Sequence, residues 1–92
     1  MNAAIRQRMA SAAKDVRTRE ILTLLYRDQP QGASFEGLKE TLYLHEDFKE
    51  ESLKALADGQ VLILSGEKYK LTPAARQILD RDPVILMDEF LR

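Results

Sequence analysis

One short stretch of the sequence gathers the side chains that could carry metal or acid–base chemistry. It contains the only histidine and four acids, namely His45, Glu46, Asp47, Glu50 and Glu51. Imidazole and carboxylate groups bind metals and transfer protons. No second histidine and no cysteine supports a metal site, however, and no nucleophile stands out for catalysis. We therefore predict that the chain is not an enzyme and has no catalytic residue, metal or cofactor. The acids are interpreted as a solvated helix face, or else as an acidic surface that docks a protein.

Basic residues gather in a different part of the chain. Residues 1–20 carry five basic side chains against two acids, a net charge of +3, whereas residues 46–58 carry two lysines against five acids, a net charge of −3. The two segments either attract each other or face different partners. The N-terminal set is either a phosphate-binding arm or an ordinary exposed helix face, and it comprises Arg6, Arg8, Lys14, Arg17 and Arg19.

The N-terminal segment that carries these charges is predicted to be helical. Residues 2–27 contain no glycine or proline and are rich in residues that favour helices. A first apolar stripe precedes residue 17, and a second one over residues 21–26 lies on nearly the opposite face. We expect a break over 15–18, with Thr18 as a possible N-cap, or a first half that packs on something else. A partner subunit or the chain's own C-terminal segment would cover the first stripe. That stripe consists of Ile5, Met9, Ala12 and Val16.

The middle of the chain predicts two shorter helices. A loop over residues 28–32 contains a proline and a glycine, which end the preceding helix. Ser34 then serves as the N-cap of a second helix that runs to Leu42. A third helix is expected over residues 46–58, ending at Gly59 in the C′ position.

The stretch Ser52–Ala75 organises the whole chain. After the third helix, residues 61–64 and 69–71 read as two strands, joined by a turn in which Gly66 supplies a positive φ. Thr72 and the proline after it start another helix. The stretch is therefore interpreted as the end of one helix, a two-stranded hairpin and the beginning of the next helix.

The C-terminal segment predicts a last helix over residues 84–91. Six of these eight residues are apolar, so that the helix needs either a core or a partner to cover it. The chain has 92 residues, which fits a single domain over 1–92. No run of apolar residues is long enough to span a membrane and no secretory signal is recognisable, so we expect a cytoplasmic protein.

Four short motifs have spacings that agree with one another: Leu42-Tyr43-Leu44, Leu53 with Leu56, Gly59-Gln60-Val61, and Tyr69-Lys70-Leu71-Thr72-Pro73-Ala74-Ala75-Arg76. Together they resemble the winged-helix branch of helix-turn-helix proteins, such as MarR-like, PadR-like and ArsR-like regulators. The resemblance covers roughly residues 18–80 and is not specific to one family. It implies a mainly α fold, in which a three-helix core carries a two-stranded wing, with N- and C-terminal helices added over 1–17 and 83–92.

The resemblance also implies a function and its residues. It implies a DNA-binding transcriptional regulator that forms a homodimer, with the third helix in the major groove and the wing on the adjacent backbone or minor groove. The expected DNA contacts are Lys49, Lys54, Lys68, Lys70, Arg17 and Arg19. The expected dimer contacts are Ile5, Met9, Val16, Ile85, Leu86, Phe90 and Leu91.

The charge pattern favours a second hypothesis. The outward positions of the third helix hold four acids and two lysines, and the pI of the chain is about 5.8. DNA presents one negative charge per ~1.7 Å of duplex, so an acidic helix is poorly suited to its groove. The alternative is a winged helix that binds a protein and not DNA, using the acidic third helix or the apolar C-terminal helix.

Overall fold

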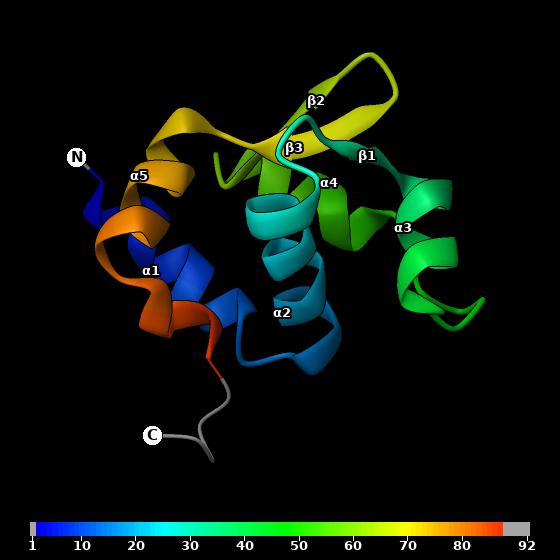
Figure 1. Cartoon of the computed structure of the whole chain (residues 1–92), viewed down its shortest axis with the longest axis horizontal. Coiled ribbons are helices and arrows are strands. Elements are labelled where there is room, and N and C mark those ends of the chain that lie inside the picture. The colour runs from blue at the N-terminus through cyan, green and yellow to red at the C-terminus, as the bar shows by residue number, and fades with distance from the viewer. Residues whose placement is uncertain (1, 88–92) are drawn as a thin grey trace.

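The computed structural model describes residues 2–87. Within this range the chain is mainly helical, with a small antiparallel sheet at one end of the helices (Figure 1). In chain order the elements are α1 (Ala3–Ala12), α2 (Val16–Thr23), the π-helical turn η1 (Leu24–Asp28), β1 (Ala33–Ser34), α3 (Phe35–Leu42), α4 (Glu51–Asp58), β2 (Leu62–Ser65), β3 (Lys68–Leu71), α5 (Pro73–Arg81) and the 3₁₀ turn η2 (Pro83–Leu86). No helix in the described range is long and apolar enough to cross a membrane.

The N-terminal segment breaks where the two apolar stripes predicted it. α1 ends at Ala12 and α2 begins at Val16. The predicted cap, Thr18, is wrong: Asp15 is the N-cap of α2, because its backbone is extended and its carboxylate accepts hydrogen bonds from both the N–H and the hydroxyl of Thr18, each at 2.9 Å. These bonds lower the pKa of Asp15, the backbone bond most. The break turns α1 onto a different face of the molecule from α2.

The chain itself covers the first half of the first apolar stripe, whereas Val16 at its end is exposed. Ile5 and Met9 are buried, and α1 lies against α5 and η2. Their assignment to a dimer interface is therefore corrected, since neither side chain is available to a second subunit. Ile85 of η2 is buried in the same core, so its assignment to a dimer interface is corrected for the same reason. Leu86 is partly buried and Val16 is exposed. Phe90 and Leu91 lie outside the described residues.

The sheet has three strands in the order β1-β3-β2, and not only the two strands of the predicted hairpin. The hairpin pairs Leu62 with Leu71, and β1 adds to its free side by pairing Ala33 with Tyr69. Gly32 makes this pairing possible: its φ is +103°, and a Cβ there would lie 2.9 Å from the Tyr69 carbonyl oxygen. Two residues of strand carry no periodic signal, so the sequence predicted no strand between the loop over residues 28–32 and the N-cap at Ser34.

The third helix is shorter than predicted. α4 begins at Glu51 and not at residue 46, because residues 45–50 form tight turns in which the Asp47 N–H donates to the His45 ring at 3.0 Å. The end of α4 also differs, since Gly59 has a negative φ and Gln60 holds the left-handed conformation, with φ 66°. At Gly59 a Cβ would lie 2.9 Å from the Arg8 side chain, which would have to shift to make room for it.

The starts of α3 and α5 follow the sequence signals. The hydroxyls of Ser34 and Thr72 accept hydrogen bonds from the N–H groups of Gly37 and Ala75, which caps α3 and α5. The segment after α5 is a 3₁₀ turn over Pro83–Leu86, and Met87 is extended. The prediction of a last helix over residues 84–91 is therefore wrong for residues 84–87. The remaining residues of that helix lie outside the described range.

Candidate binding surface

A buried tyrosine holds the hairpin against the start of α4. Tyr69 is 1% exposed, and its hydroxyl donates a 2.8 Å hydrogen bond to the carboxylate of Glu50. Burial first, and then the adjacent Glu50, raise the pKa of Tyr69 to about 12. This hydrogen bond joins strand β3 to the turn before α4, and we call the exposed side chains of that turn, of α4 and of the hairpin the α4–hairpin surface.

Four lysines of this surface were predicted from the sequence as DNA contacts. Lys49, Lys54 and Lys68 are exposed and Lys70 is partly buried. Within the described residues, none of the four takes part in an ion pair. The strand register pairs Ile63 with Lys70, and alternation along β3 puts Lys68 on the same face. The hairpin therefore presents two lysines together on the face opposite the buried Tyr69.

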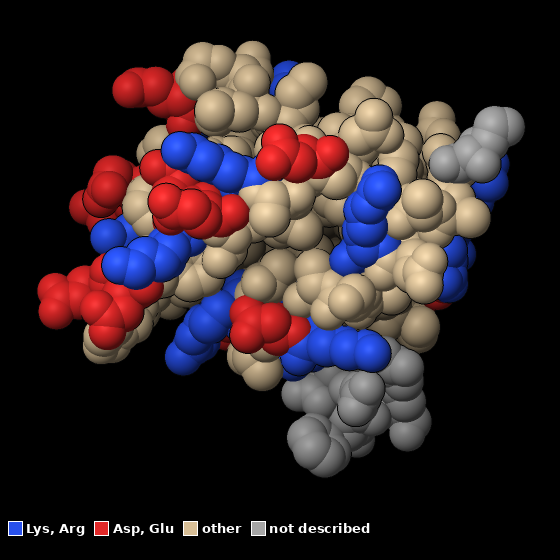
Figure 2. Space-filling model, turned by 180° about the vertical axis from the view of Figure 1, so that it is seen from behind, with Lys and Arg blue, Asp and Glu red and all other residues tan. Residues whose placement is uncertain are grey.

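The exposed side of α4 is acidic. Leu53 is buried, Leu56 and Ala57 pack against the core, and Ser52 and Ala55 line a hollow toward α1. The other exposed side chains of α4 are two acids and one lysine, namely Glu51, Asp58 and Lys54. Over residues 46–70 the chain has four lysines and six acids, a net charge of −2. Figure 2 shows this mixture, with acidic and basic side chains interspersed over one side of the molecule.

The N-terminal arginines are engaged within the chain. Arg17 forms an ion pair with Glu20 at 2.8 Å, and Arg19 donates to the Ala13 carbonyl oxygen at 2.9 Å. On α1, Arg6 pairs with Asp82 and Arg8 donates to the carbonyl oxygen of Gly59 at 3.0 Å. The structure thus gives local partners to Arg17 and Arg19, the two arginines predicted to contact DNA, and it does not place them on the surface of α4 and the hairpin.

Tyr43 belongs to the turn motif Leu42-Tyr43-Leu44, but the sequence did not predict it as a binding residue. It follows α3, it is 90% exposed and its backbone is left-handed, with φ 52° and ψ 45°. The Leu44 N–H donates to the Lys39 carbonyl oxygen at 3.0 Å and Leu44 is buried, which is the geometry of a helix end that normally carries glycine. The available signal was an aromatic residue at the position where a C′ glycine is expected.

His45 lies in the turn that precedes α4. Its Nδ1 lies 3.4 Å from a carboxylate oxygen of Asp47, and both side chains are exposed. Over residues 2–87 no group of three or more histidine, cysteine or acidic side chains is arranged to hold a metal ion. The geometry leaves this pair as a local turn contact.

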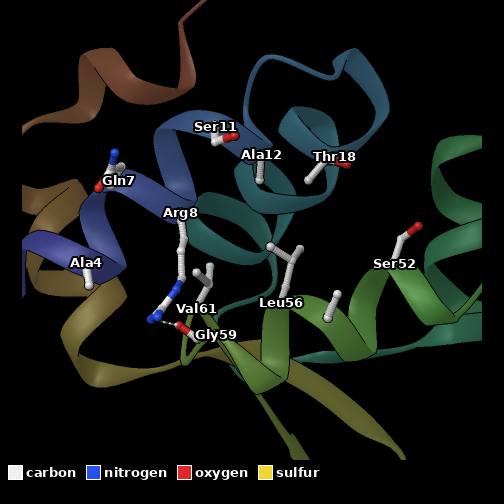
Figure 3. A pocket seen from close by; sticks show the side chains of 11 residues that line it. Ala4, Gln7, Arg8, Ser11, Ala12, Thr18, Ser52, Leu56, Gly59 and Val61 are labelled. Carbon is white, nitrogen blue, oxygen red and sulfur yellow. Dashed lines mark hydrogen bonds between the residues drawn. The ribbon is translucent and has the colours of Figure 1, made fainter.

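A groove of about 530 Å³ separates α1 from α4. Figure 3 shows side chains of α1 and α4 facing each other across it, with Arg8 bonded to Gly59 at one end. A second hollow of about 430 Å³ lies beside η2, lined by Val16 and Leu86 among others. Neither hollow has a signal in the sequence, because each depends on how segments distant in the chain come together.

Comparisons with protein-family models, with curated proteins and with solved structures give no match to this chain.

Proposed function

We propose that this chain is a winged-helix module that binds a partner protein through Tyr43 and the exposed side of α4. The order α2, α3, α4, β2, β3, α5 supports the winged-helix interpretation, because it is the order that the sequence motifs imply. The α4–hairpin surface is the part of the molecule that such a module would use.

The observation that carries the proposal is Tyr43. An aromatic ring that is 90% exposed gains nothing from the core, and its left-handed backbone costs free energy that glycine would not. Tyrosine is enriched among the residues that dominate protein–protein binding energy. A strained and solvated tyrosine between two helices is therefore best explained by a contact with a partner.

The charges around Tyr43 indicate the chemistry of that partner. Within four residues of it lie the exposed acids Glu40, Glu46 and Asp47 and one half-buried lysine, Lys39, so the net charge around the ring is −2. Carboxylates attract lysine and arginine side chains, and the face of a tyrosine ring binds a guanidinium group. The partner surface is accordingly basic.

The test is a selection of random peptides displayed on phage against the purified protein. We expect enrichment of arginine- and lysine-containing peptides whose binding is lost in Tyr43→Ser and retained in the control Tyr26→Phe. Tyr26 is a suitable control because its hydroxyl donates to Asp80, on another part of the molecule. Selected peptides that bind Tyr43→Ser as well as the unaltered chain would refute the proposal.

DNA binding is the second candidate, and the unpaired lysines of α4 and the hairpin favour it. Backbone contacts by these lysines would give an affinity for random duplex that falls steeply between about 50 and 200 mM salt. The double variant Lys68→Glu/Lys70→Glu would then lose binding, whereas Tyr43→Ser would keep most of it. Absence of duplex binding at the lower salt excludes this candidate and leaves the protein partner.

A homodimer is the remaining part of the proposal. Val16, Val84 and Met87 are each at least 44% exposed, and Val16 and Leu86 line the hollow beside η2. A twofold axis would bury these apolar side chains against their own copies. We expect a dimer in sedimentation velocity that Val16→Asp converts to monomer. A monomer at high concentration of the unaltered chain would contradict this expectation.

A further inference from the structure

The groove between α1 and α4 has walls of small side chains and an apolar floor. Ala4 and Ala12 on α1 face Ala55 on α4, while Leu56 and the buried Val61 close the bottom. Its volume of about 530 Å³ falls in the range of small-molecule sites. Polar groups at the edges come from Gln7, Ser11, Thr18 and Ser52.

Along the groove, α1 and α4 do not pack closely against each other. Small residues normally allow helices to approach, and protein interiors leave few voids larger than a water molecule. Here the Arg8 side chain crosses from α1 to the end of α4 and bonds the Gly59 carbonyl oxygen, as Figure 3 shows. A side chain at position 59 would clash with this arm. Arg8 therefore closes one end of the groove and leaves the rest open.

Arg8 also sets the charge of the groove. It is the single charged side chain among the residues that line it, all of which lie in the described range. Its guanidinium has five N–H donors, and the bond to Gly59 uses one of them. The remaining donors match a carboxylate or phosphate oxygen, and no acid in the lining competes for them.

We propose that this groove binds a small amphipathic organic anion. The anionic group bonds the Arg8 guanidinium, and the apolar body lies over Leu56 and Val61 between the two rows of small side chains. The site is separate from the Tyr43 surface, and the proposal stands whether or not that surface binds a protein.

Two dyes with matched aromatic bodies test the charge requirement. Anilinonaphthalene sulfonate is an anion, whereas N-phenylnaphthylamine lacks the sulfonate. We expect one molecule of the sulfonate to bind per chain, and Arg8→Gln to weaken it about tenfold while the neutral dye changes little. Arg8→Lys should restore most of the affinity, and Arg6→Gln, which removes a charge from α1 outside the groove, should have no effect.

A second variant tests the location. Ala55→Phe fills the groove from α4 without touching Arg8, so it should abolish binding of both dyes in a chain that still unfolds cooperatively. Amide NMR shifts should map the sulfonate to residues of α1 and α4, and octanoate and octyl phosphate should displace it where octanol does not. Shifts confined to the exposed patch around Val84, or equal binding to the Arg8→Gln and Ala55→Phe variants, would overturn the proposal.

Discussion

Replacing Tyr43 by glycine should make the protein more stable and bind its partner less well. Tyr43 occupies the left-handed position that ends α3, with φ 52°, and its side chain is 90% exposed. Glycine adopts this conformation without a steric penalty. Because the ring buries almost no surface in this chain, its removal costs little hydrophobic stabilisation.

The magnitude follows from two opposing terms. A residue with a Cβ pays about 1–2 kcal/mol in the left-handed conformation. The stabilisation from relieving this strain is partly lost, because glycine raises the conformational entropy of the unfolded chain by the equivalent of about 0.4–1 kcal/mol. The net stabilisation is about 0.5–1 kcal/mol, which for a domain of this size raises Tm by roughly 2–8 °C.

Thermal unfolding followed by circular dichroism, with urea unfolding as a check, measures the effect. Tyr43→Ala is the matched control, because it removes the ring and keeps the backbone cost. Gln60→Gly is an independent test, since Gln60 has φ 66° and is exposed. The reasoning fails if Tyr43→Gly melts at or below the temperature of Tyr43→Ala.

Four further substitutions test other parts of the fold. Gly32→Ala should cost about 2 kcal/mol or more, measured by urea unfolding, because the new methyl group meets the β3 backbone, whereas Gly66→Ala should cost only about 1 kcal/mol, since its surroundings are open. Tyr69 keeps its proton in the folded state up to a pKa of about 12, above its ordinary value of 10, so stability present below pH 10 should fall as the pH rises from 10 to 12. Tyr69→Phe should flatten that part of the Tm profile and, if it does not, the assignment of the loss to Tyr69 is wrong. Asp15→Ala should cost about 1 kcal/mol near neutral pH, and this contribution should disappear in acid, because the lowered pKa of Asp15 gives stability that is lost as the pH falls through it.

Sequence and structure agree best where the interactions are local. The caps at Ser34 and Thr72, the turn at Gly66 and the break between the two apolar stripes of the N-terminal segment all depend on residues a few positions apart. Errors appeared where two local signals competed. Asp15, and not Thr18, caps α2. The Asp47 N–H donates to the His45 ring, and α4 begins after the turn that this bond forms.

The candidate surfaces were only partly predictable. The lysines and acids of residues 46–70 could be read from the sequence, since exposed charges need no tertiary partner. The role of the arginines could not, because Arg8 and Arg6 bond to residues 51 and 76 positions away. The exposure of the Tyr43 side chain could not be predicted either, because it depends on the burial of the neighbouring Leu44 in the core.

The sequence by itself determined most of the helices, the hairpin and the starts of α3 and α5, since hydrogen bonds and side-chain periodicity along a short segment suffice for these. The tertiary structure alone decided what covers Ile5 and Met9, that Ala33 and Ser34 join the hairpin as a third strand, and that α1 and α4 stand apart with Arg8 between them. Each of these features depends on contacts between segments far apart in the chain, and such contacts form only when the whole core is assembled.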